Sequence, residues 1–435
     1  MSFDSPAFWF VVVALWCACQ LIRHNAARKM LLIAASYFIY SSFFPAGSKL
    51  IYMLLLAGVT AGSFAVARMA NRGVLIAGVW IAAGGLAAAK GWLNPVPVGL
   101  SFYLLQAIAW MMESYRSAKP GAGNLLDFGL YMSFFPRLTA GPIVRAEEFL
   151  PQLAKRPLVD SAARWEGVVL IVFGLFKKLA LADNLGLVAN PVFADIHMHQ
   201  EVSPSRILLA TYGFAAQIYC DFSGYSDMAL GAARLFGYQL PENFNWPYLA
   251  RNPADFWRRW HISLSNWLRD YVYFSLPGHR SRSRIPMYLN LLVTMAVCGL
   301  WHGYQWTFLL WGIYHGFLLV IHHATKRMNS ILLMQQLTVA GWVLFRTERL
   351  SDLTAYTAGL FHGPFFSGFQ PDEWIAVVIV CGVVLFHLLE PRLQLAKTIT
   401  ANHWNPWACT VLLLLGLITA ALSLPEQQMF LYFQF

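Results

Sequence analysis

The chain has 435 residues, of which 58% are hydrophobic and 12% are charged. This leaves too little polar surface to coat a soluble globule of such a size, so we expect an integral membrane protein. The net charge of +10 belongs mostly to short loops, which indicates membrane topology and lipid contact and excludes a nucleic-acid partner. The six cysteines lie in or beside apolar stretches without paired spacing, which predicts neither a disulfide framework nor a metal site.

The first third of the chain contains five apolar runs, at about residues 7–22, 30–46, 50–67, 74–89 and 98–112. Several of them are short for a membrane span of about 20 residues. Alternate loops between them carry the basic residues Arg23, Arg28, Lys29, Arg68, Arg72, Arg116 and Lys119. The positive-inside rule therefore places the N-terminus outside the cell. Asp4 precedes the first apolar run and the basic residues follow it, which argues against a cleavable signal peptide.

Residues 124–145 combine apolar character with helix breakers. The stretch FFPRLTAGPIVR places Pro136, Gly141 and Pro142 inside an otherwise apolar segment. Broken helices at membrane depth need protein or a water-filled cavity to satisfy their freed backbone groups. We expect this segment to be re-entrant and to line a cavity.

Two further runs, at residues 167–182 and 206–222, are expected to cross outward and return. Lys177 and Lys178 then have to snorkel or to face the protein interior. The second run ends in YCDFSGYSDMALG, where Asp221 and Asp227 are either metal ligands or caps of short helices. No further carboxylate cluster is at hand, so we favour capping.

The sequence pattern of residues 255–274 predicts a helix that lies at the membrane interface. At 100° per residue the apolar residues Trp257, Trp260, Leu264, Trp267, Leu268 and Tyr271 share one face, opposite Arg258, Arg259, Asn266, Arg269 and Asp270. His261 falls on the apolar face and points inward. For a lone histidine the favoured interpretation is a buried imidazole satisfied by a backbone carbonyl.

The next segment, residues 288–301, is apolar and would enter the membrane, which places His302 at membrane depth. An ionisable group inside a bilayer is costly enough to indicate a functional role. Gly299 and Gly303, and then Gly312 and Gly316, have the four-residue spacing that lets membrane helices approach closely. The alternative is that the histidines are hydrogen-bonding links between these helices.

The remaining polar features lie between and after these runs. Residues 251–284 hold seven Arg against two Asp, which suits either an anionic lipid surface or a phosphate-bearing donor. Further runs end near Phe345 and cover residues 374–389 and 407–424, so the tail PEQQMFLYFQF emerges outside. Its Tyr432 has aromatic neighbours, as residues of an interfacial belt do.

Several longer motifs occur together and in order: FPRLTAGPIVR, DFSGYSDMALG, ENFNWPY, FWRRWHISLSNWLRDYVY and GLWHG. In these the chain resembles the membrane-bound O-acyltransferase family, in particular its bacterial branch that acetylates alginate, peptidoglycan or cellulose. The D-alanine exporters of teichoic acid systems share the same plan. The match covers about residues 95–320, with FLYFQF as an additional element.

The resemblance implies an all-α membrane protein with about 11–12 membrane helices, plus re-entrant and interfacial helices, ringed around a central tunnel. The whole chain, 1–435, would be one domain, with N-terminal helices at 1–123, a catalytic core at 124–322 and C-terminal helices at 323–435. His302 in GLWHG corresponds to the family's invariant histidine, and His261 in RWHIS to its second histidine. Tyr432 corresponds to a tyrosine proposed to carry the acyl group.

The implied reaction is acyl transfer from a thioester to a hydroxyl, with His302 as general base. His261 would orient the donor or donate a hydrogen bond to the oxyanion. The substrate tunnel would be lined by Trp301, Asn290, Trp257, Arg258, Arg259 and His315.

The implied donor is acetyl-CoA, with no bound cofactor or metal, and the implied site is the bacterial inner membrane. An extracytoplasmic SGNH-type acetyltransferase would finish the transfer, and membrane lipids are the other partners. Two alternatives stay open: a D-alanyl exporter supplied by a carrier protein, and a non-enzymatic transporter or flippase. An acidic carrier protein would suit the basic segment as well as the phosphates of CoA do.

Overall fold

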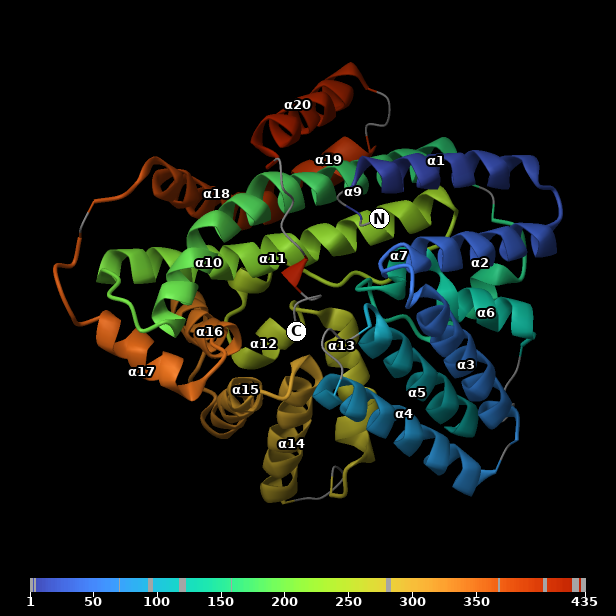
Figure 1. The fold of residues 1–435 in the computed structure, drawn as a ribbon, viewed down its shortest axis with the longest axis horizontal. Coiled ribbons are helices and arrows are strands. Elements are labelled where there is room, and N and C mark those ends of the chain that lie inside the picture. The colour runs from blue at the N-terminus through green and yellow to red at the C-terminus, as the bar shows by residue number, and fades with distance from the viewer. Residues whose placement is uncertain are drawn as a thin grey trace. The chain divides into compact units, whose positions relative to one another are not determined.

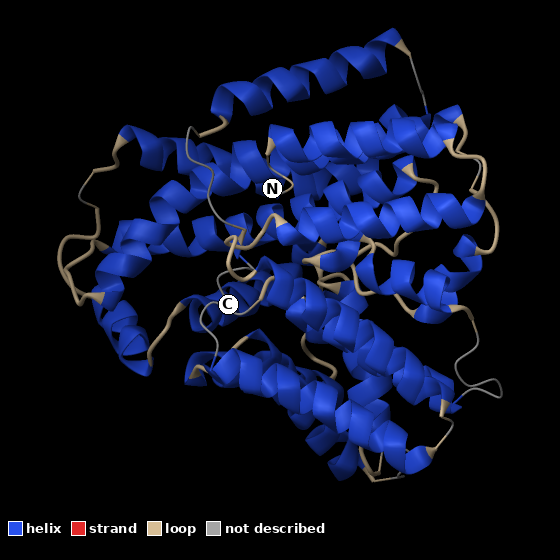
Figure 2. Ribbon diagram, turned by 45° about the vertical axis from the view of Figure 1, so that its right-hand side comes forward, coloured by secondary structure: helices blue, strands red, loops and turns tan. Residues whose placement is uncertain are grey.

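The computed structural model describes residues 3, 5–69, 71–92, 97–116, 123–157, 159–278, 283–366, 368–401, 405–424 and 430–431. These ranges contain helices and no strand (Figure 2), so the predicted all-α class is confirmed. Contacts within the chain define two units. The first comprises Met1–Gly174, Tyr225–Glu242 and Thr400–Cys409, and the second comprises Leu175–Gly224, Asn243–Ile399 and Thr410–Phe435. The subdivision at residues 123 and 322 stays a prediction.

The first unit begins with the helices that the apolar runs predicted. They are α1 (Pro6–Leu21), α2 (Asn25–Ser41), α3 (Lys49–Arg68), α4 (Arg72–Trp92) and α5 (Leu100–Arg116), labelled in Figure 1. The Ser5 hydroxyl accepts a hydrogen bond from the Phe8 amide at 3.3 Å and caps α1. The five predicted runs are therefore confirmed as helices.

The predicted break within residues 124–145 is also present. α6 (Leu125–Ser133) stops at Phe134, and the short α7 (Phe135–Leu138) and α8 (Ala146–Leu153) follow. Arg137 is buried there, donates to Gln106 Oε1 at 2.7 Å and lies 4.5 Å from the ring centre of Tyr131. The cavity expected beside this segment stays a prediction.

The two following helices are longer than predicted. α9 (Ser161–Leu175) runs through a π-helical turn (Phe176–Ala182) into α10 (Asp183–His197), and α11 covers Pro204–Leu235. Because α11 is continuous through DFSGYSDMALG, Asp221 and Asp227 lie inside a helix, and the expectation that they cap short helices is wrong. Lys178 faces the protein interior, as one of the two predicted options required.

The second unit holds most of the remaining chain. Its elements after α11 are a 3₁₀ turn (Pro247–Leu249), α12 (Pro253–Trp257), α13 (Ile262–Trp267), a π-helical turn (Leu268–Val272), a 3₁₀ turn (Tyr273–Ser275), α14 (Arg284–His302), α15 (Trp306–Thr325), α16 (Ile331–Arg346), α17 (Leu350–Gly359) and α18 (Pro371–Leu393). α19 (Leu395–Ala401) and α20 (Pro406–Leu422) each begin in one unit and end in the other.

The glycine seam between α14 and α15 is confirmed. A Cβ added at Gly299 would meet the carbonyl oxygen of Phe308, and one at Gly312 would meet that of Met295. The two backbones therefore touch directly, which only glycine permits. Figure 1 shows the pair side by side.

Five of the described helices, α3, α4, α14, α15 and α18, are long and apolar enough to cross a membrane. Three shorter helices, α1, α16 and α20, are also apolar. A chain with this many apolar helices belongs in a lipid bilayer, because many of their large apolar side chains are exposed on the protein.

Candidate active site

The predicted helix over residues 255–274 is interrupted at the histidine. α12 ends at Trp257 and α13 begins at Ile262, with His261 between them in the left-handed conformation (φ 42°, ψ 55°). That conformation costs a residue with a Cβ about 1–2 kcal/mol, so surrounding contacts have to hold it. The side chain is nonetheless buried, with 1% of its surface exposed, so the predicted inward orientation is confirmed although the continuous helix is wrong.

Asn243 holds this turn. Its backbone carbonyl accepts from the Ile262 amide at 2.9 Å, and its side-chain oxygen lies 3.1 Å from His261 Nδ1. The same Oδ1 accepts from the amide of Ser263 at 3.2 Å and from its hydroxyl at 2.9 Å. Asn243 lies within the motif ENFNWPY, but nothing in its sequence neighbours indicates a partner eighteen residues away.

These contacts define the tautomer of His261. The Ser263 amide can only donate, so the Asn243 atom that it meets is the carbonyl oxygen, and the atom of His261 facing that oxygen carries the proton. Nδ1 is therefore the donor, and Nε2 holds the lone pair. Burial lowers the pKa of His261 to about 3, which keeps the ring neutral at pH 7. The hydrogen-bond acceptor at Nδ1 is thus a side-chain oxygen, and the expected backbone carbonyl is not the partner.

His302 is placed differently, as the last residue of α14. It keeps 4% of its surface exposed and is surrounded by aromatic rings. Ring centres lie 4.8 Å away for Trp301, 5.3 Å for Trp311 and 5.0 Å for Phe345. The burial that its apolar sequence context predicted is confirmed.

Trp301 connects the two histidines. Its ring centre is 6.0 Å from that of His261 and 4.8 Å from that of His302. The indole thus touches both imidazoles, which come from elements about forty residues apart in the sequence. The structure brings together three of the predicted site residues.

The C-terminal tail also reaches this group. The Leu431 amide donates to Asp221 Oδ2 at 2.9 Å, and the Phe430 ring centre lies 6.0 Å from that of Phe222. Phe222 in turn makes an edge contact with His261, with 4.6 Å between ring centres. Tyr432, the predicted acyl carrier, lies outside the described residues.

His315 lies next to this group in an aromatic cluster. It is fully buried, stacks on Phe256 at 5.8 Å and contacts Trp257 and Trp311 at 5.2 and 5.0 Å. Among the residues that the structure describes, neither ring nitrogen of His315 has a hydrogen-bond partner. The interpretation of His315 as a hydrogen-bonding link between helices is therefore wrong, and its place in the lining of a tunnel stays a prediction.

The other predicted tunnel residues make contacts of their own. Arg258 is exposed and donates to the Ala254 carbonyl at 3.2 Å. Arg259 pairs with Asp255 at 2.8 Å and donates to the Asn245 carbonyl at 3.2 Å. Asn290 donates to the Pro277 carbonyl at 3.1 Å and so ties α14 to the preceding loop. These contacts stabilise the local fold, and the substrate roles of the three residues stay predictions.

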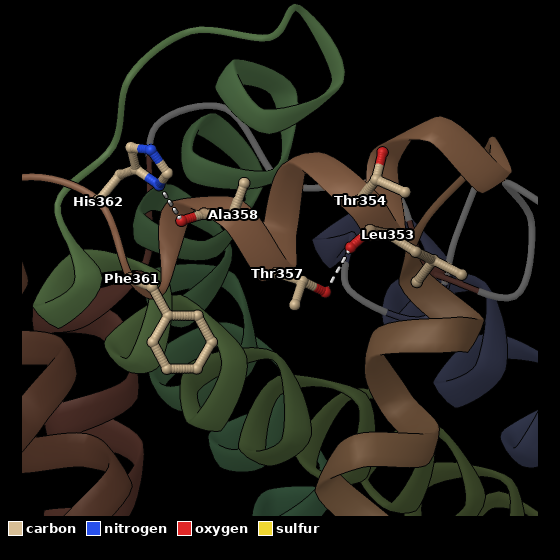
Figure 3. Close-up of a pocket in the computed structure, with 6 residues that line it drawn as sticks. All are labelled: Leu353, Thr354, Thr357, Ala358, Phe361 and His362. Carbon is tan, nitrogen blue, oxygen red and sulfur yellow. Dashed lines mark hydrogen bonds between the residues drawn. The ribbon is translucent and has the colours of Figure 1, made fainter.

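A surface pocket on α17 is unrelated to these residues. It is lined by Leu353, Thr354, Thr357, Ala358, Phe361 and His362, all from one stretch of chain. Figure 3 shows the His362 ring bonded to the Ala358 carbonyl, 3.0 Å away, and the Thr357 hydroxyl bonded to Leu353. No predicted site residue lines this pocket. His362 is exposed, so it can serve as a control position for substitutions of the buried histidines.

Comparison with known proteins accounts for the motifs. The model of the membrane-bound O-acyltransferase family matches residues 108–351, which is more than half of the chain. The chain is 35% identical to the probable alginate O-acetylase AlgI of Pseudomonas aeruginosa over 390 residues, 80% of this chain and 73% of that protein.

Two further relatives differ in the polymer or the group that their names give. The peptidoglycan O-acetyltransferase of Helicobacter pylori is 35% identical over 304 residues, covering 61% of this chain and 56% of that one. The teichoic acid D-alanyltransferase of Streptococcus thermophilus is 29% identical over 295 residues, 64% of this chain and 69% of that one. The chain thus belongs to the membrane-bound O-acyltransferase family and is a membrane-embedded O-acyltransferase.

Proposed function

We propose that the protein moves an acetyl group from cytoplasmic acetyl-CoA across the bacterial inner membrane, for O-acetylation of an extracytoplasmic polysaccharide or peptidoglycan. The observation that carries the proposal is the contact of Trp301 with both His261 and His302, beside a C-terminal tail that ends in a tyrosine motif. Two buried imidazoles that share a neighbouring indole are suited to acyl transfer.

Acetyl is favoured over D-alanyl as the transferred group. The relatives named for acetylation are 33–35% identical to this chain, and those named for D-alanyl transfer are 27–29% identical. Family membership also argues against the transporter or flippase, because the relatives' names describe group transfer.

The proposed reaction begins with a hydroxyl oxygen attacking the thioester carbonyl carbon. A neutral imidazole at His302 takes the hydroxyl proton as the C–O bond forms, which typically contributes about 10²–10⁴ in rate. The tetrahedral intermediate then breaks its C–S bond, and the coenzyme A thiolate leaves and receives the proton from His302. The products are an acetyl ester and free coenzyme A thiol.

His261 acts as a hydrogen-bond acceptor in this scheme. Its Nδ1 proton is donated to Asn243, and its pKa of about 3 keeps Nε2 unprotonated at pH 7. Such a nitrogen accepts a hydrogen bond and has no proton to donate, so of the two predicted roles of His261 it favours orientation over donation to the oxyanion. The neutral Nε2 suits orientation of the attacking hydroxyl.

The first acceptor in the proposal is the hydroxyl of Tyr432. Leu431, its neighbour in the chain, is hydrogen-bonded to Asp221, whose own neighbour Phe222 contacts His261. The acetyl group would then pass to an extracytoplasmic SGNH-type acetyltransferase and on to the polymer. Cytoplasmic acetyl-CoA and membrane lipids are the other proposed partners.

The test uses purified protein in detergent, incubated with acetyl-CoA, and measures the mass of the C-terminal peptide together with release of free thiol. We expect one acetyl adduct on wild-type protein and none on Tyr432→Phe, which keeps the ring but lacks the nucleophile. Incubation with a D-alanyl-charged carrier protein should leave the peptide unmodified.

An adduct from the D-alanyl carrier alone would overturn the acetyl assignment. An unchanged adduct on Tyr432→Phe would show that Tyr432 is not the acyl acceptor and that the tail is an interfacial anchor. Size-exclusion profiles of both proteins provide the check that each is folded.

A further inference from the structure

We propose that Asp221, held by Lys178 and Asp183, is a positioning residue that anchors the C-terminal tail against the site of the two histidines. The contact between Asp221 and the tail does not depend on the proposed function. Its effect on acetyl transfer does rest on that function.

The anchor is a buried group of three charged side chains. Lys178 Nζ lies 2.8 Å from Asp183 Oδ1 and 2.8 Å from Asp221 Oδ1, and all three residues are buried. Lys178 comes from the π-helical turn, Asp183 from the start of α10 and Asp221 from α11. The second oxygen of Asp221, Oδ2, accepts the Leu431 amide at 2.9 Å.

The charges explain why the tail amide belongs here. Asp221 is a buried carboxylate, and a buried charge is costly unless an opposite charge and hydrogen-bond donors meet it. A backbone N–H donating to an ionised carboxylate is stronger than a neutral hydrogen bond and contributes more than the usual protein value. Lys178 thus meets one oxygen of the buried Asp221 carboxylate, and the tail amide donates to the other.

The anchor is linked to the reaction site through adjacent residues. Phe222 follows Asp221 in α11 and contacts both the Phe430 ring, at 6.0 Å, and the His261 ring, at 4.6 Å. Leu431 and Phe430 are themselves buried. Two successive residues of α11 thus hold two successive residues of the tail, and one of them also packs on His261.

The first experiment measures hydrogen exchange of the Leu431 amide in the full-length protein by mass spectrometry. Asp221→Ala and Asp183→Ala are a matched pair, because each removes one carboxylate that pairs with Lys178, and among the contacts of the described residues it is Asp221 that meets the tail. We expect exchange at Leu431 to rise by about tenfold or more in Asp221→Ala and to stay near wild type in Asp183→Ala. Equal exchange in the two variants overturns the anchor.

The second experiment leaves the charged group intact and removes the donor. Leu431→Pro lacks the backbone N–H, whereas Leu431→Met keeps it and conserves the side-chain volume. We expect the acetyl adduct on the C-terminal peptide to form at least about tenfold more slowly in Leu431→Pro than in Leu431→Met. Equal rates in the two variants overturn the positioning role. A wild-type protein that forms no adduct refutes the proposed function, while the exchange experiment still decides the anchor.

Discussion

His302 and His261 are held in place by opposite means. His302 ends a regular helix, α14, whose position depends on the glycine seam with α15 and on the rings around it. His261 sits in a strained turn between two short helices, and a single side chain from a distant loop, Asn243, holds both its backbone neighbour and its Nδ1 atom. The position of His302 therefore depends on packing spread over many residues, and that of His261 to a large part on the backbone and side chain of one residue, Asn243.

This contrast predicts which substitutions should displace each histidine from its position. Damage to the glycine seam should remove His302 together with the fold of the second unit. Damage to Asn243 should leave the fold and change the turn and the tautomer of His261. The following changes separate the two, from the largest expected effect to the smallest.

Gly299→Leu should have the largest effect. Its side chain would overlap the backbone of α15 at Phe308, so α14 and α15 cannot approach, and we expect no folded protein after purification in detergent. Gly382→Leu is the matched control on α18, where nothing lies within 4 Å of an added Cβ. A monodisperse Gly299→Leu protein with wild-type yield would show that the seam does not position His302.

Asn243→Ala should lower acetyl transfer by about 10–100-fold while the protein stays folded, because His261 loses the acceptor that orients it. The stability cost should be about 1–3 kcal/mol, since the Ser263 amide is left without its acceptor. Asn243→Asp supplies a carboxylate that favours the protonated ring and raises the pKa of His261, so its activity should fall as the pH is lowered through that pKa. Transfer rates within twofold of wild type for both variants would contradict the role of Asn243.

The pH dependence of stability should carry a contribution from His261. Burial lowers its folded pKa to about 3, below its ordinary value, so its contribution is fully present above pH 6.5 and is lost as the pH falls. Between pH 6.5 and pH 5 that loss is about 2 kcal/mol. His261→Asn, whose side chain tolerates the left-handed turn, should lose less stability than wild type on acidification, and parallel denaturation curves for the two proteins would exclude this contribution.

The smallest effects are expected on the arginines of α12 and the turn that follows it. Arg259 pairs with Asp255 at 2.8 Å, and Arg258, the residue that follows α12, donates to the Ala254 carbonyl of that helix. Arg259→Ala should cost up to about 1 kcal/mol in unfolding free energy and Arg258→Ala about none, as is usual for partly exposed pairs. A loss of acetyl-CoA affinity in Arg258→Ala without a stability change would instead support the predicted contact with the donor.

The sequence predicted the features that repeat locally. The apolar runs, the glycine spacing of Gly299 and Gly312 and the inward orientation of His261 each follow from periodicity within one segment, and the structure has all of them. The same periodicity missed the interruption before Ile262. That break depends on Asn243, whose hydrogen bonds cross from another loop and offset the cost of a left-handed residue.

The tail contact was beyond sequence reasoning for a similar reason. Asp221 and Leu431 are 210 positions apart, and the buried group with Lys178 and Asp183 forms only when α10 and α11 are in place. An aspartate beside serines and a glycine indicates a cap when it is considered alone, and the continuous course of α11 excludes that interpretation. Charged residues in an apolar run were the available signal, since such residues are buried only with partners.

The most direct test of His302 as the general base is the single-turnover rate of acetyl transfer from acetyl-CoA to the C-terminal peptide in His302→Ala. The control is His362→Ala, in the exposed turn after α17. The account predicts a rate at least about 100-fold below wild type for His302→Ala, because the general base is gone, and a wild-type rate for the control. A folded His302→Ala protein that acetylates its tail at the wild-type rate would contradict it.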